Sequence, residues 1–331
     1  MKHVNVALFV VHKGCPHTCS FCNQRSITGV SHELEPGDVH KAVETAVASL
    51  DAGAAAAGEI AFFGGSFTMI EREYMISLLE AAHKYVREGL FKGIRISTRP
   101  DGINGEICDI LEKYGVSAVE LGAQSMDNRV LELNERGHTA EQVEAAFDLL
   151  RSRGFETGLQ MMTGLYGSSD ESDMETALKI RDMRPDTVRI YPTVVLKNTK
   201  LDALMQSGEF VPKGIEETVE LCARIIPLFN EAGIRIIRVG LHSGGNVEDE
   251  RTGGAYHPAL RELCDGRIYL DAALRELDGR PAGKYSLAVA KGCVSKMTGQ
   301  KKKNLFHLKD LGYECNVFQD DELNEYEVRV R

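Results

Sequence analysis

Short apolar runs alternate with stretches of helical pattern along most of the chain. Seven of these runs have the length and β-branched content of buried strands: residues 4–11, 59–64, 94–98, 116–122, 155–162, 187–193 and 234–240. Helical patterns separate them, at about 36–51, 71–88, 104–114 and 170–183, and in the stretches that lead to about 153 and 232. Strands that alternate with helices predict parallel βαβ units with right-handed crossovers. We therefore expect an α/β fold, a partial (β/α)6 barrel of the TIM type, with residues 234–240 as a peripheral seventh strand.

The pattern changes near GRPAGKYS, residues 279–286. Beyond it the order is strand, helix, a GQKKKN loop, helix and two strands, which is the order of a small α+β unit. We therefore expect two domains. Residues 1–275 would hold the barrel and its helical extension, and residues 281–331 would form the small C-terminal domain.

Polar and glycine-rich segments follow most of the predicted strands: GCPHTC, GGSFT, STRPDG, GAQS and TGLYGSSD. In a barrel of this type such loops open onto one face, where the chemistry of the fold takes place. For any single loop, a glycine that simply ends its strand is an equally good explanation. Five such loops at one face favour a functional site.

Composition and charge narrow the class of protein. The chain has 331 residues, 43% of them hydrophobic, and a formal net charge of −10. This charge argues against a general affinity for nucleic acid or anionic membranes, but it leaves room for one basic patch. No apolar run approaches the ~20 residues that span a bilayer, and MKHVNVALFVVHKG is weak as a secretory signal. We expect a cytoplasmic protein with no membrane partner.

Eight cysteines are present, and five of them are scattered singly. In a cytosolic chain of this size a disulfide framework is not expected, so these five are predicted to be small buried hydrophobic residues. The five are Cys108, Cys222, Cys264, Cys293 and Cys315. Their spacing gives no support for a second metal cluster.

The other three, Cys15, Cys19 and Cys22, lie together in GCPHTCSFCNQ. Clustered thiolates bind zinc, copper or iron–sulfur centres. Structural zinc needs a fourth ligand, and the neighbouring His12 and His17 are cramped candidates. A four-iron cluster held by three thiolates keeps one iron free for a substrate or cofactor. The spacing therefore predicts a three-cysteine [4Fe-4S] cluster, with zinc and free thiols as the alternatives.

This motif, Cys-x3-Cys-x2-Cys in the loop after the first strand with Phe21 before the third cysteine, resembles the signature of the radical S-adenosylmethionine (SAM) superfamily. The resemblance implies that the open iron chelates the amino and carboxylate groups of SAM. One electron from the reduced cluster then cleaves SAM to methionine and a 5′-deoxyadenosyl radical. It also implies a low-potential electron donor, flavodoxin or ferredoxin. The cofactors would be the [4Fe-4S] cluster and SAM.

The later loops resemble the other motifs of this superfamily in order. FFGGSFT is similar to the second-strand motif, so that backbone groups of Gly64, Gly65 and Ser66 would meet the amino group of SAM; glycine suits a close backbone approach. ELGAQS is similar to the fourth-strand motif, in which Gln124 would point at the cofactor. Arg136, in NERGH, matches an arginine that pairs with the SAM carboxylate.

The resemblance also implies which residues would contact the adenosine part of SAM. GLQMMTGLYG is similar to the fifth-strand motif that lines adenine and ribose, and Phe21 would offer adenine an apolar surface. Related enzymes often place a glutamate for the ribose hydroxyls where this chain has Ser97. Serine lacks the reach and charge of glutamate, so Gln160 is a candidate substitute.

Three longer segments narrow the resemblance: ELGAQSMDNRVLELNERGHTAEQV, GLQMMTGLYGSSDESD and PDTVRIYPTVVLKNTKL. Over roughly residues 4–240 the chain resembles the radical-SAM domain of the catalytic subunit of Elongator, which modifies wobble uridine in tRNA. It resembles oxygen-independent coproporphyrinogen III oxidase more distantly. The cysteine spacing is tighter than in Elongator, and nothing after residue 240 resembles an acetyl-CoA pyrophosphate loop, so an acetyltransferase domain is not expected.

Substrate contacts are predicted in two places. Arg189, Tyr191 and Lys197, on the sixth strand and its loop, would face the substrate; solvent-facing loop residues are the competing account.

The tail from KYSLAVAKG onward is similar to a minimal KH-like RNA-binding unit, although the second glycine of its GXXG loop is missing. Lys301, Lys302 and Lys303 in this loop could meet phosphates, and a solvated lysine loop is the alternative.

The sequence therefore predicts a radical SAM enzyme that acts on RNA, with tRNA as the favoured substrate. Two alternatives stay open. The first is a radical SAM enzyme that acts on a small molecule such as a tetrapyrrole, or on a peptide. The second is a non-enzymatic iron–sulfur protein with a redox or scaffold role.

Overall fold

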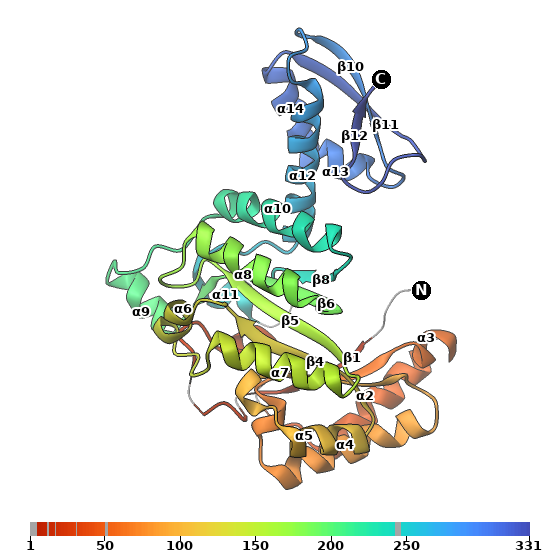
Figure 1. Cartoon of the computed structure of the whole chain (residues 1–331), viewed down its shortest axis with the longest axis vertical. Coiled ribbons are helices and arrows are strands. Elements are labelled where there is room, and N and C mark those ends of the chain that lie inside the picture. Colours follow the sequence, from red (N-terminus) through yellow and green to blue (C-terminus); the bar gives the residue numbers. More distant parts are fainter. Residues whose placement is uncertain (1–4, 12, 17, 31, 50–51, 242–245) are drawn as a thin grey trace.

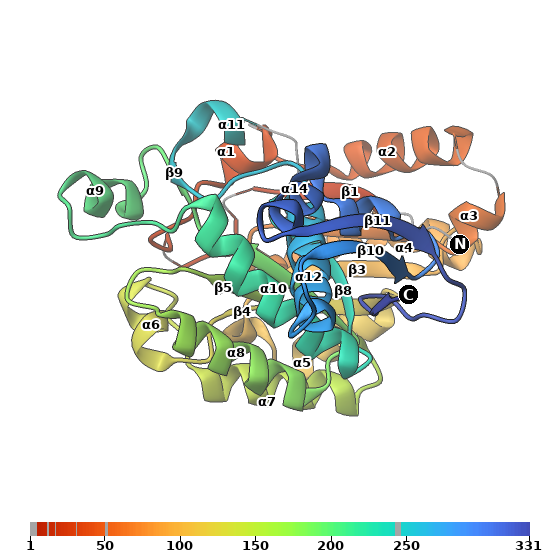
Figure 2. The same cartoon turned by 90° about the horizontal axis from the view of Figure 1, so that it is seen from above.

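A sheet of seven parallel strands forms the centre of the protein (Figures 1 and 2). The computed structural model describes residues 5–11, 13–16, 18–30, 32–49, 52–241 and 246–331. In spatial order the strands are β1 (Asn5–Val10), β2 (Glu59–Gly64), β3 (Gly93–Thr98), β4 (Val116–Gln124), β5 (Glu156–Thr163), β6 (Thr187–Pro192) and β8 (Arg235–Val239). The predicted partial (β/α)6 barrel is thus confirmed, and the predicted seventh strand lies at the edge of the sheet as β8.

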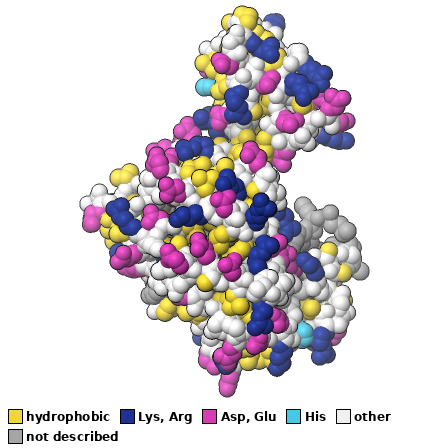
Figure 3. Space-filling model, viewed as in Figure 1, with side chains coloured by type: hydrophobic (Ala, Val, Ile, Leu, Met, Phe, Trp, Pro, Cys, Tyr) yellow, Lys and Arg dark blue, Asp and Glu magenta, His cyan; other side chains and the backbone are white. Residues whose placement is uncertain are grey.

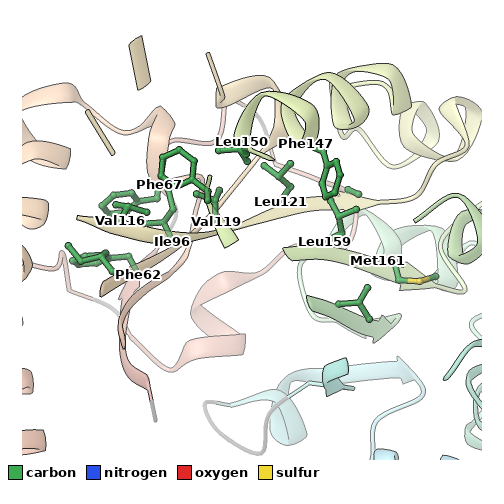
Figure 4. Close-up of a cluster of buried hydrophobic side chains, with 14 of the residues drawn as sticks. Phe62, Phe67, Ile96, Val116, Val119, Leu121, Phe147, Leu150, Leu159 and Met161 are labelled. Atoms are coloured by element: carbon green, nitrogen blue, oxygen red, sulfur yellow. The ribbon is translucent and has the colours of Figure 1, made fainter. Parts of the chain in front are cut away.

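Six helices pack on the outer face of this sheet (Figure 1). They are α2 (Pro36–Ser49), α4 (Arg72–Arg87), α5 (Gly105–Lys113), α7 (Ala140–Ser152), α8 (Asp170–Met183) and α10 (Ile215–Glu231). Capping residues set where several of them begin: the hydroxyls of Thr139 and Ser169 accept backbone N–H bonds at the first turns of α7 and α8. In Figure 4, Phe147 and Leu150 of α7 lie against strand residues such as Leu121.

The two faces of the strands differ sharply because side chains alternate along a strand. Val119 and Leu121 of β4 belong to the apolar core under the helices, and Leu159 and Met161 of β5 do the same (Figure 4). The residue between the first two, Glu120, points to the opposite, inward face and is also buried. The inward face therefore carries polar and charged groups inside a β/α shell.

Shorter elements complete the half-barrel. The helices are α1 (Gln24–Thr28), α3 (Ala52–Ala56), α6 (Asn128–Leu133), α9 (Lys200–Gln206) and α11 (Val247–Glu250), with short 3-10 turns η1 (Phe67–Met69) and η2 (Pro100–Gly102). The strands β7 (Val194–Leu196) and β9 (Arg251–Gly254) form a separate antiparallel pair. This pair was not expected from the sequence, because each strand is too short to show an alternating pattern.

The C-terminal unit stands at the far end of a long helix, α12 (Leu260–Leu277) (Figure 1). Its elements are β10 (Gly283–Val289), α13 (Val294–Thr298), η3 (Gln300–Lys302), α14 (Lys303–Asp310), β11 (Tyr313–Gln319) and β12 (Val328–Val330). β10 pairs in parallel with β11 and antiparallel with β12. This is the predicted order of strands and helices; the similarity to a KH unit stays a prediction.

The helix α12 contributes to two separate hydrophobic clusters. Its first half places Leu260 and Cys264 in the core of the half-barrel. Its second half places Tyr269 and Leu277 in the core of the C-terminal unit. The predicted division between residues 275 and 281 stays a prediction. Among the described residues, no helix is both long and apolar enough to cross a membrane.

Candidate active site

The loop that carries the three cysteines is bound to the end of β2 through backbone hydrogen bonds. The N–H of Gly65 donates to the carbonyl of Val10 (2.6 Å), and the N–H of Ser66 donates to that of Lys13 (3.1 Å). A Cβ atom at Gly65 would lie 2.1 Å from the Lys13 carbonyl oxygen, which no side chain can accommodate. Gly64 has a φ of +110°, and a Cβ atom there would lie 2.7 Å from the carbonyl oxygen of Val10. The two glycines thus allow the cysteine loop to approach the sheet.

The middle cysteine is held from the side of β4. Cys19 is buried, and its Sγ accepts a hydrogen bond from Nη1 of Arg136 (3.1 Å). Nη2 of the same guanidinium donates to the carbonyl of Gly122 (2.6 Å). The neighbouring Ser20 is fixed by Asn134, through a backbone bond of 3.1 Å and a side-chain bond of 2.7 Å. The segment from Asn134 to Arg136 therefore positions the cysteine loop.

The three sulfur atoms lie near enough to affect each other's ionisation. Burial, and then the neighbouring Cys19 and Cys15, raise the pKa of the Cys22 thiol to about 12. Burial and Cys19 also raise the pKa of Cys15. Thiols of this kind keep their protons until a cation displaces them, because a metal or iron–sulfur centre binds the thiolate.

Among the described residues, no three His, Cys, Asp or Glu side chains come close enough together to hold a single metal ion. A four-iron cluster makes a different demand, since each thiolate binds its own corner iron. The donor set of three soft thiolates suits such a cluster. His12 and His17, the candidate fourth ligands for zinc, lie outside the described residues.

A cavity of about 410 Å³ opens beside this loop, at the carboxyl ends of the strands. Eight residues predicted to bind the cluster, SAM or substrate line it: Phe21, Cys22, Gly64, Ser97, Gln124, Gln160, Arg189 and Tyr191. Its other walls are mostly apolar and include Phe9, Phe63 and Met162. The structure thus brings predicted residues of the five strands β2 to β6 and of the cysteine loop to one cavity of the size that holds small ligands.

Two buried polar atoms near this cavity have no hydrogen-bond partner among the described residues. They are Oε1 of Gln124 and Nε of Arg136. Buried polar atoms are normally paired, so each such atom needs an explanation. A ligand that carries both an ammonium and a carboxylate group would satisfy the two of them, and the amino-acid end of SAM carries both. The residues present therefore fit this cofactor.

Three residues of the cavity wall, Ser97, Gln160 and Arg189, belong to a buried network around Glu120. Oε2 and Oε1 of Glu120 accept bonds from Nε and Nη2 of Arg189 (2.5 and 2.8 Å). Nε2 of Gln160 donates to Glu120 (2.9 Å) and to the hydroxyl of Ser97 (3.3 Å). Ser97 and Gln160 are thus neighbours, as a shared role at the ribose requires. Glu120 was missed by the sequence reasoning; the signal was a carboxylate in the middle of the apolar run VSAVELGA.

The other predicted site residues do not line the cavity. Cys15, Cys19, Gly65 and Arg136 surround the cysteine loop, as described above. The hydroxyl of Ser66 is bonded to that of Thr98 (2.9 Å), so this side chain has a structural partner.

Lys197 lies on the surface. Its Nζ donates to the carbonyl of Asp249 (2.9 Å), and the residue is not among those that line the cavity. Its predicted role in substrate binding stays a prediction, without support from this placement.

A second hollow, of about 520 Å³, lies in the C-terminal unit. Lys301 and Lys302 line it together with residues of α13 and Gln319 of β11. Neither of these lysines nor Lys303 forms an ion pair with a described residue. Phe306, one turn further along α14, has a side chain that is 59% exposed. Figure 3 shows Lys and Arg side chains at several places on the visible face of this unit, with Asp and Glu among them.

Comparison with known proteins identifies the family of the chain. The pattern of the Radical SAM superfamily matches residues 9–180, and that of the Radical_SAM C-terminal domain matches residues 185–269. The chain belongs to the radical SAM superfamily and is an enzyme.

Two curated relatives show which members of the superfamily this chain resembles in sequence. Elongator complex protein 3 of Saccharomyces cerevisiae is 30% identical over 246 residues, which cover 68% of this chain and 43% of that protein. The tRNA uridine(34) acetyltransferase of Methanocaldococcus infernus is 32% identical over 183 residues, 49% of this chain and 34% of that protein. The chain thus spans 34% to 43% of the length of these two relatives. The predicted resemblance to the Elongator catalytic subunit is confirmed.

Solved structures agree on the fold. The archaeal Elp3 of Methanocaldococcus infernus, with an N-terminal deletion, has a TM-score of 0.63 at 24% identity, over 80% of this chain and 62% of that one. Coproporphyrinogen III oxidase from Escherichia coli has a TM-score of 0.47, which is too low to carry an argument.

Proposed function

We propose that this protein binds a [4Fe-4S] cluster through Cys15, Cys19 and Cys22 and uses it to cleave SAM. The observation that carries the proposal is the placement of the cysteine loop beside a cavity lined by Gln124, whose Oε1 has no partner among the described residues, with the unpartnered Nε of Arg136 beside Cys19 of the same loop. When bound, such a cluster supplies the electron that splits SAM into methionine and a 5′-deoxyadenosyl radical able to abstract hydrogen from a substrate.

The residues of the chain would divide the work of binding SAM. Arg136 presents a planar fork next to Cys19 and would take the carboxylate. Gln124 would accept a hydrogen bond from the amino group, beside the backbone of Gly64. Ser97 and Gln160 would share the ribose hydroxyls, and Phe21 would cover adenine. The apolar walls would exclude water, which protects a reactive intermediate from side reactions.

The test is anaerobic reconstitution with iron and sulfide, followed by dithionite and SAM. We expect 5′-deoxyadenosine from the wild-type protein, and neither a complete cluster nor SAM cleavage from Cys15→Ala, Cys19→Ala or Cys22→Ala. Cys315→Ala is the matched control, since this half-buried cysteine lies in the C-terminal unit. Cleavage that survives in the triple cysteine variant would refute the proposal. A reconstituted cluster without any SAM cleavage would favour a redox or scaffold protein.

The proposed substrate is RNA, with tRNA favoured. Two observations support this: the names of the relatives refer to tRNA uridine or to Elongator, and the hollow of the C-terminal unit presents lysines without acidic partners. Lysines of this kind neutralise phosphates, and an exposed aromatic ring such as Phe306 can stack on a base. The proposal includes a cytoplasmic setting and flavodoxin or ferredoxin as the electron donor.

Binding of unfractionated tRNA tests the substrate. The triple variant Lys301→Ala, Lys302→Ala, Lys303→Ala should lower affinity at least about ten-fold at ~0.1 M salt and flatten its salt dependence. Lys284→Ala is the control, because this exposed lysine already pairs with Glu314. Unchanged tRNA affinity in the triple variant would remove the main structural support for RNA and favour a small-molecule or peptide substrate.

A further inference from the structure

Two arginines lie side by side on the inward face of the last two strands. Arg189 of β6 is the register partner of Arg238 of β8, and both line the cavity. Like charges on neighbouring strands repel each other, so such a pair is unfavourable unless something neutralises it. β8 is the edge strand of the sheet, and Arg238 is exposed at this edge. The pair therefore lies where the cavity meets the solvent-exposed edge of the sheet.

The two guanidinium groups differ in their partners. Both carboxylate oxygens of Glu120 accept hydrogen bonds from Arg189. The Cζ atom of the Arg189 guanidinium lies 5.2 Å from the centroid of the Phe63 ring. Arg238 forms no ion pair or hydrogen bond with any described side chain. Glu120 is not available as a counter-charge for Arg238, because its carboxylate already accepts hydrogen bonds from Arg189, Gln160 and Arg95. Within the part of the chain that the structure describes, the charge of Arg238 is thus left without a counter-charge, in a protein whose net charge is −10.

The surroundings increase the effect of this charge. The cavity that Arg238 lines has mostly apolar walls, and a low-dielectric concave surface strengthens the attraction of an arginine for an anion. Tyr191, on the same strand as Arg189, lines the same end of the cavity. Burial raises the pKa of its phenol, so the hydroxyl stays protonated and can donate a hydrogen bond at neutral pH.

We propose that Arg238, with Tyr191 and the Glu120-bound Arg189, forms a subsite for an oxyanion of the substrate. The oxyanion is a phosphate of a nucleotide or a carboxylate of a small molecule. It would sit at the β6–β8 end of the cavity, and the apolar, planar part of the substrate would extend toward the cysteine loop. This inference rests on the proposed function, since it describes the substrate of the same cavity.

The subsite is separate from the one proposed for the carboxylate of SAM. That group is assigned to Arg136, which is bonded to Gly122 of β4 and to Cys19. Arg238 lies on β8, with β5 and β6 between it and β4 in the sheet. One cavity would therefore hold two anionic groups at opposite ends, the cofactor's at one and the substrate's at the other.

Calorimetry of the reconstituted, SAM-loaded enzyme tests the subsite with uridine, uridine 5′-monophosphate and succinate as probes. We expect the monophosphate or succinate to bind at least ten-fold more tightly than uridine. Arg238→Gln should remove most of that difference, and Arg238→Lys should keep part of it because the charge remains without the planar fork. A preference for the monophosphate would identify a nucleotide phosphate as the source of the oxyanion, and a preference for succinate a carboxylate.

Arg235→Gln is the matched control. This arginine lies on the same strand, but its guanidinium already pairs with Glu156 (3.1 Å), so probe binding should match the wild type. Wild-type enzyme that prefers neither anion to uridine would overturn the inference, as would equal anion binding by Arg238→Gln. A loss of SAM affinity in Arg238→Gln as large as the loss for the probe would also overturn it, because the arginine would then serve the cofactor. Formation of 5′-deoxyadenosine by the same wild-type sample separates these outcomes from a failure of the proposed function.

Discussion

Arginines lie at both ends of the inward face of the half-barrel, but they differ in whether acidic residues pair with them. At the amino ends of the strands, Nε of Arg95 donates to Glu59 (2.7 Å) and Nη2 donates to Glu156 (2.6 Å), and the guanidinium has almost no contact with solvent. At the carboxyl ends, Arg136 keeps a buried Nε without a partner, and Arg238 has no acidic neighbour within ion-pair distance among the described residues. Charges at the first end hold the strands together, whereas Arg136 and Arg238 at the second end keep groups available to ligands.

This difference follows from the cost of burying charge. A buried ion must be paired, or its desolvation destabilises the fold. A site that binds a charged ligand keeps donors and acceptors that the protein itself leaves incomplete, and the ligand completes them. Substitutions at the amino ends of the strands should therefore mainly lower stability, and substitutions at the carboxyl ends should mainly weaken ligand binding.

The largest effect is expected for Arg95→Met. It removes the buried cation that bridges Glu59, Glu120 and Glu156, and the free energy of unfolding should fall by about 3–5 kcal/mol. Denaturant unfolding of the metal-free protein, followed by circular dichroism, measures the change. Arg72→Met is the control, because its pair with Glu106 lies at the surface and should change the free energy of unfolding far less. A loss for Arg95→Met that is no larger than the control's would mean that the amino-end network does not hold the strands.

At the other end, Arg136→Gln should mainly weaken cofactor binding. Loss of one charge-assisted contact lowers affinity for SAM by about ten- to a hundred-fold, or about 1.4–2.8 kcal/mol. Equilibrium binding of SAM to reconstituted protein, with iron content measured in parallel, gives the result. Arg129→Gln, on the nearby helix α6, should bind SAM like the wild type. Wild-type SAM affinity in Arg136→Gln would remove the cofactor role from this residue.

A smaller effect should appear as a pH dependence of stability. Burial, and then the charges of Arg136 and Arg99, lower the pKa of His138 to about 3. In the unfolded chain His138 binds a proton near pH 6.5, whereas in the folded protein it stays neutral at that pH. The free energy of unfolding therefore falls as the pH drops below 6.5. At pH 5.5 this loss is about 1.4 kcal/mol relative to pH 8.

His138→Gln should lack this component, because glutamine does not titrate and its amide can still donate to the carbonyl of Ala123. Unfolding measured at pH 8 and pH 5.5 for both proteins isolates the contribution. The exposed His32→Gln serves as the control and should follow the wild type. Identical pH profiles for wild type and His138→Gln would show that His138 is not buried in its neutral form.

Much of the fold could be predicted from the sequence, because each strand is a short apolar run between helices. The strand at 59–64 and the helix at 170–183 have the bounds that their patterns indicated, and the other predicted strands differ from the structure by one or two residues. The antiparallel pair β7 and β9 could not be predicted in this way. Its strands are held by contacts between segments more than 50 residues apart, and such contacts leave no local pattern.

The candidate site was only partly visible in the sequence. The cysteine spacing and the glycine loops identified the residues at the carboxyl ends of the strands. The paired charges of the inward face were missed because each strand was read as a uniformly apolar run. The signal was present in EIAFF, IRIST, VELGAQ and VRIYP, where one charged residue falls on the face opposite the apolar ones. Arg238, in IRIIRVG, belongs to the same pattern.

The most direct test of the central claim is electron paramagnetic resonance of the anaerobically reconstituted and reduced protein, recorded with and without SAM. The account predicts about four irons per chain and a spectrum that changes when SAM is added, because the iron without a thiolate would bind it. A protein that assembles no such cluster, or a cluster whose spectrum SAM leaves unchanged, would contradict the account.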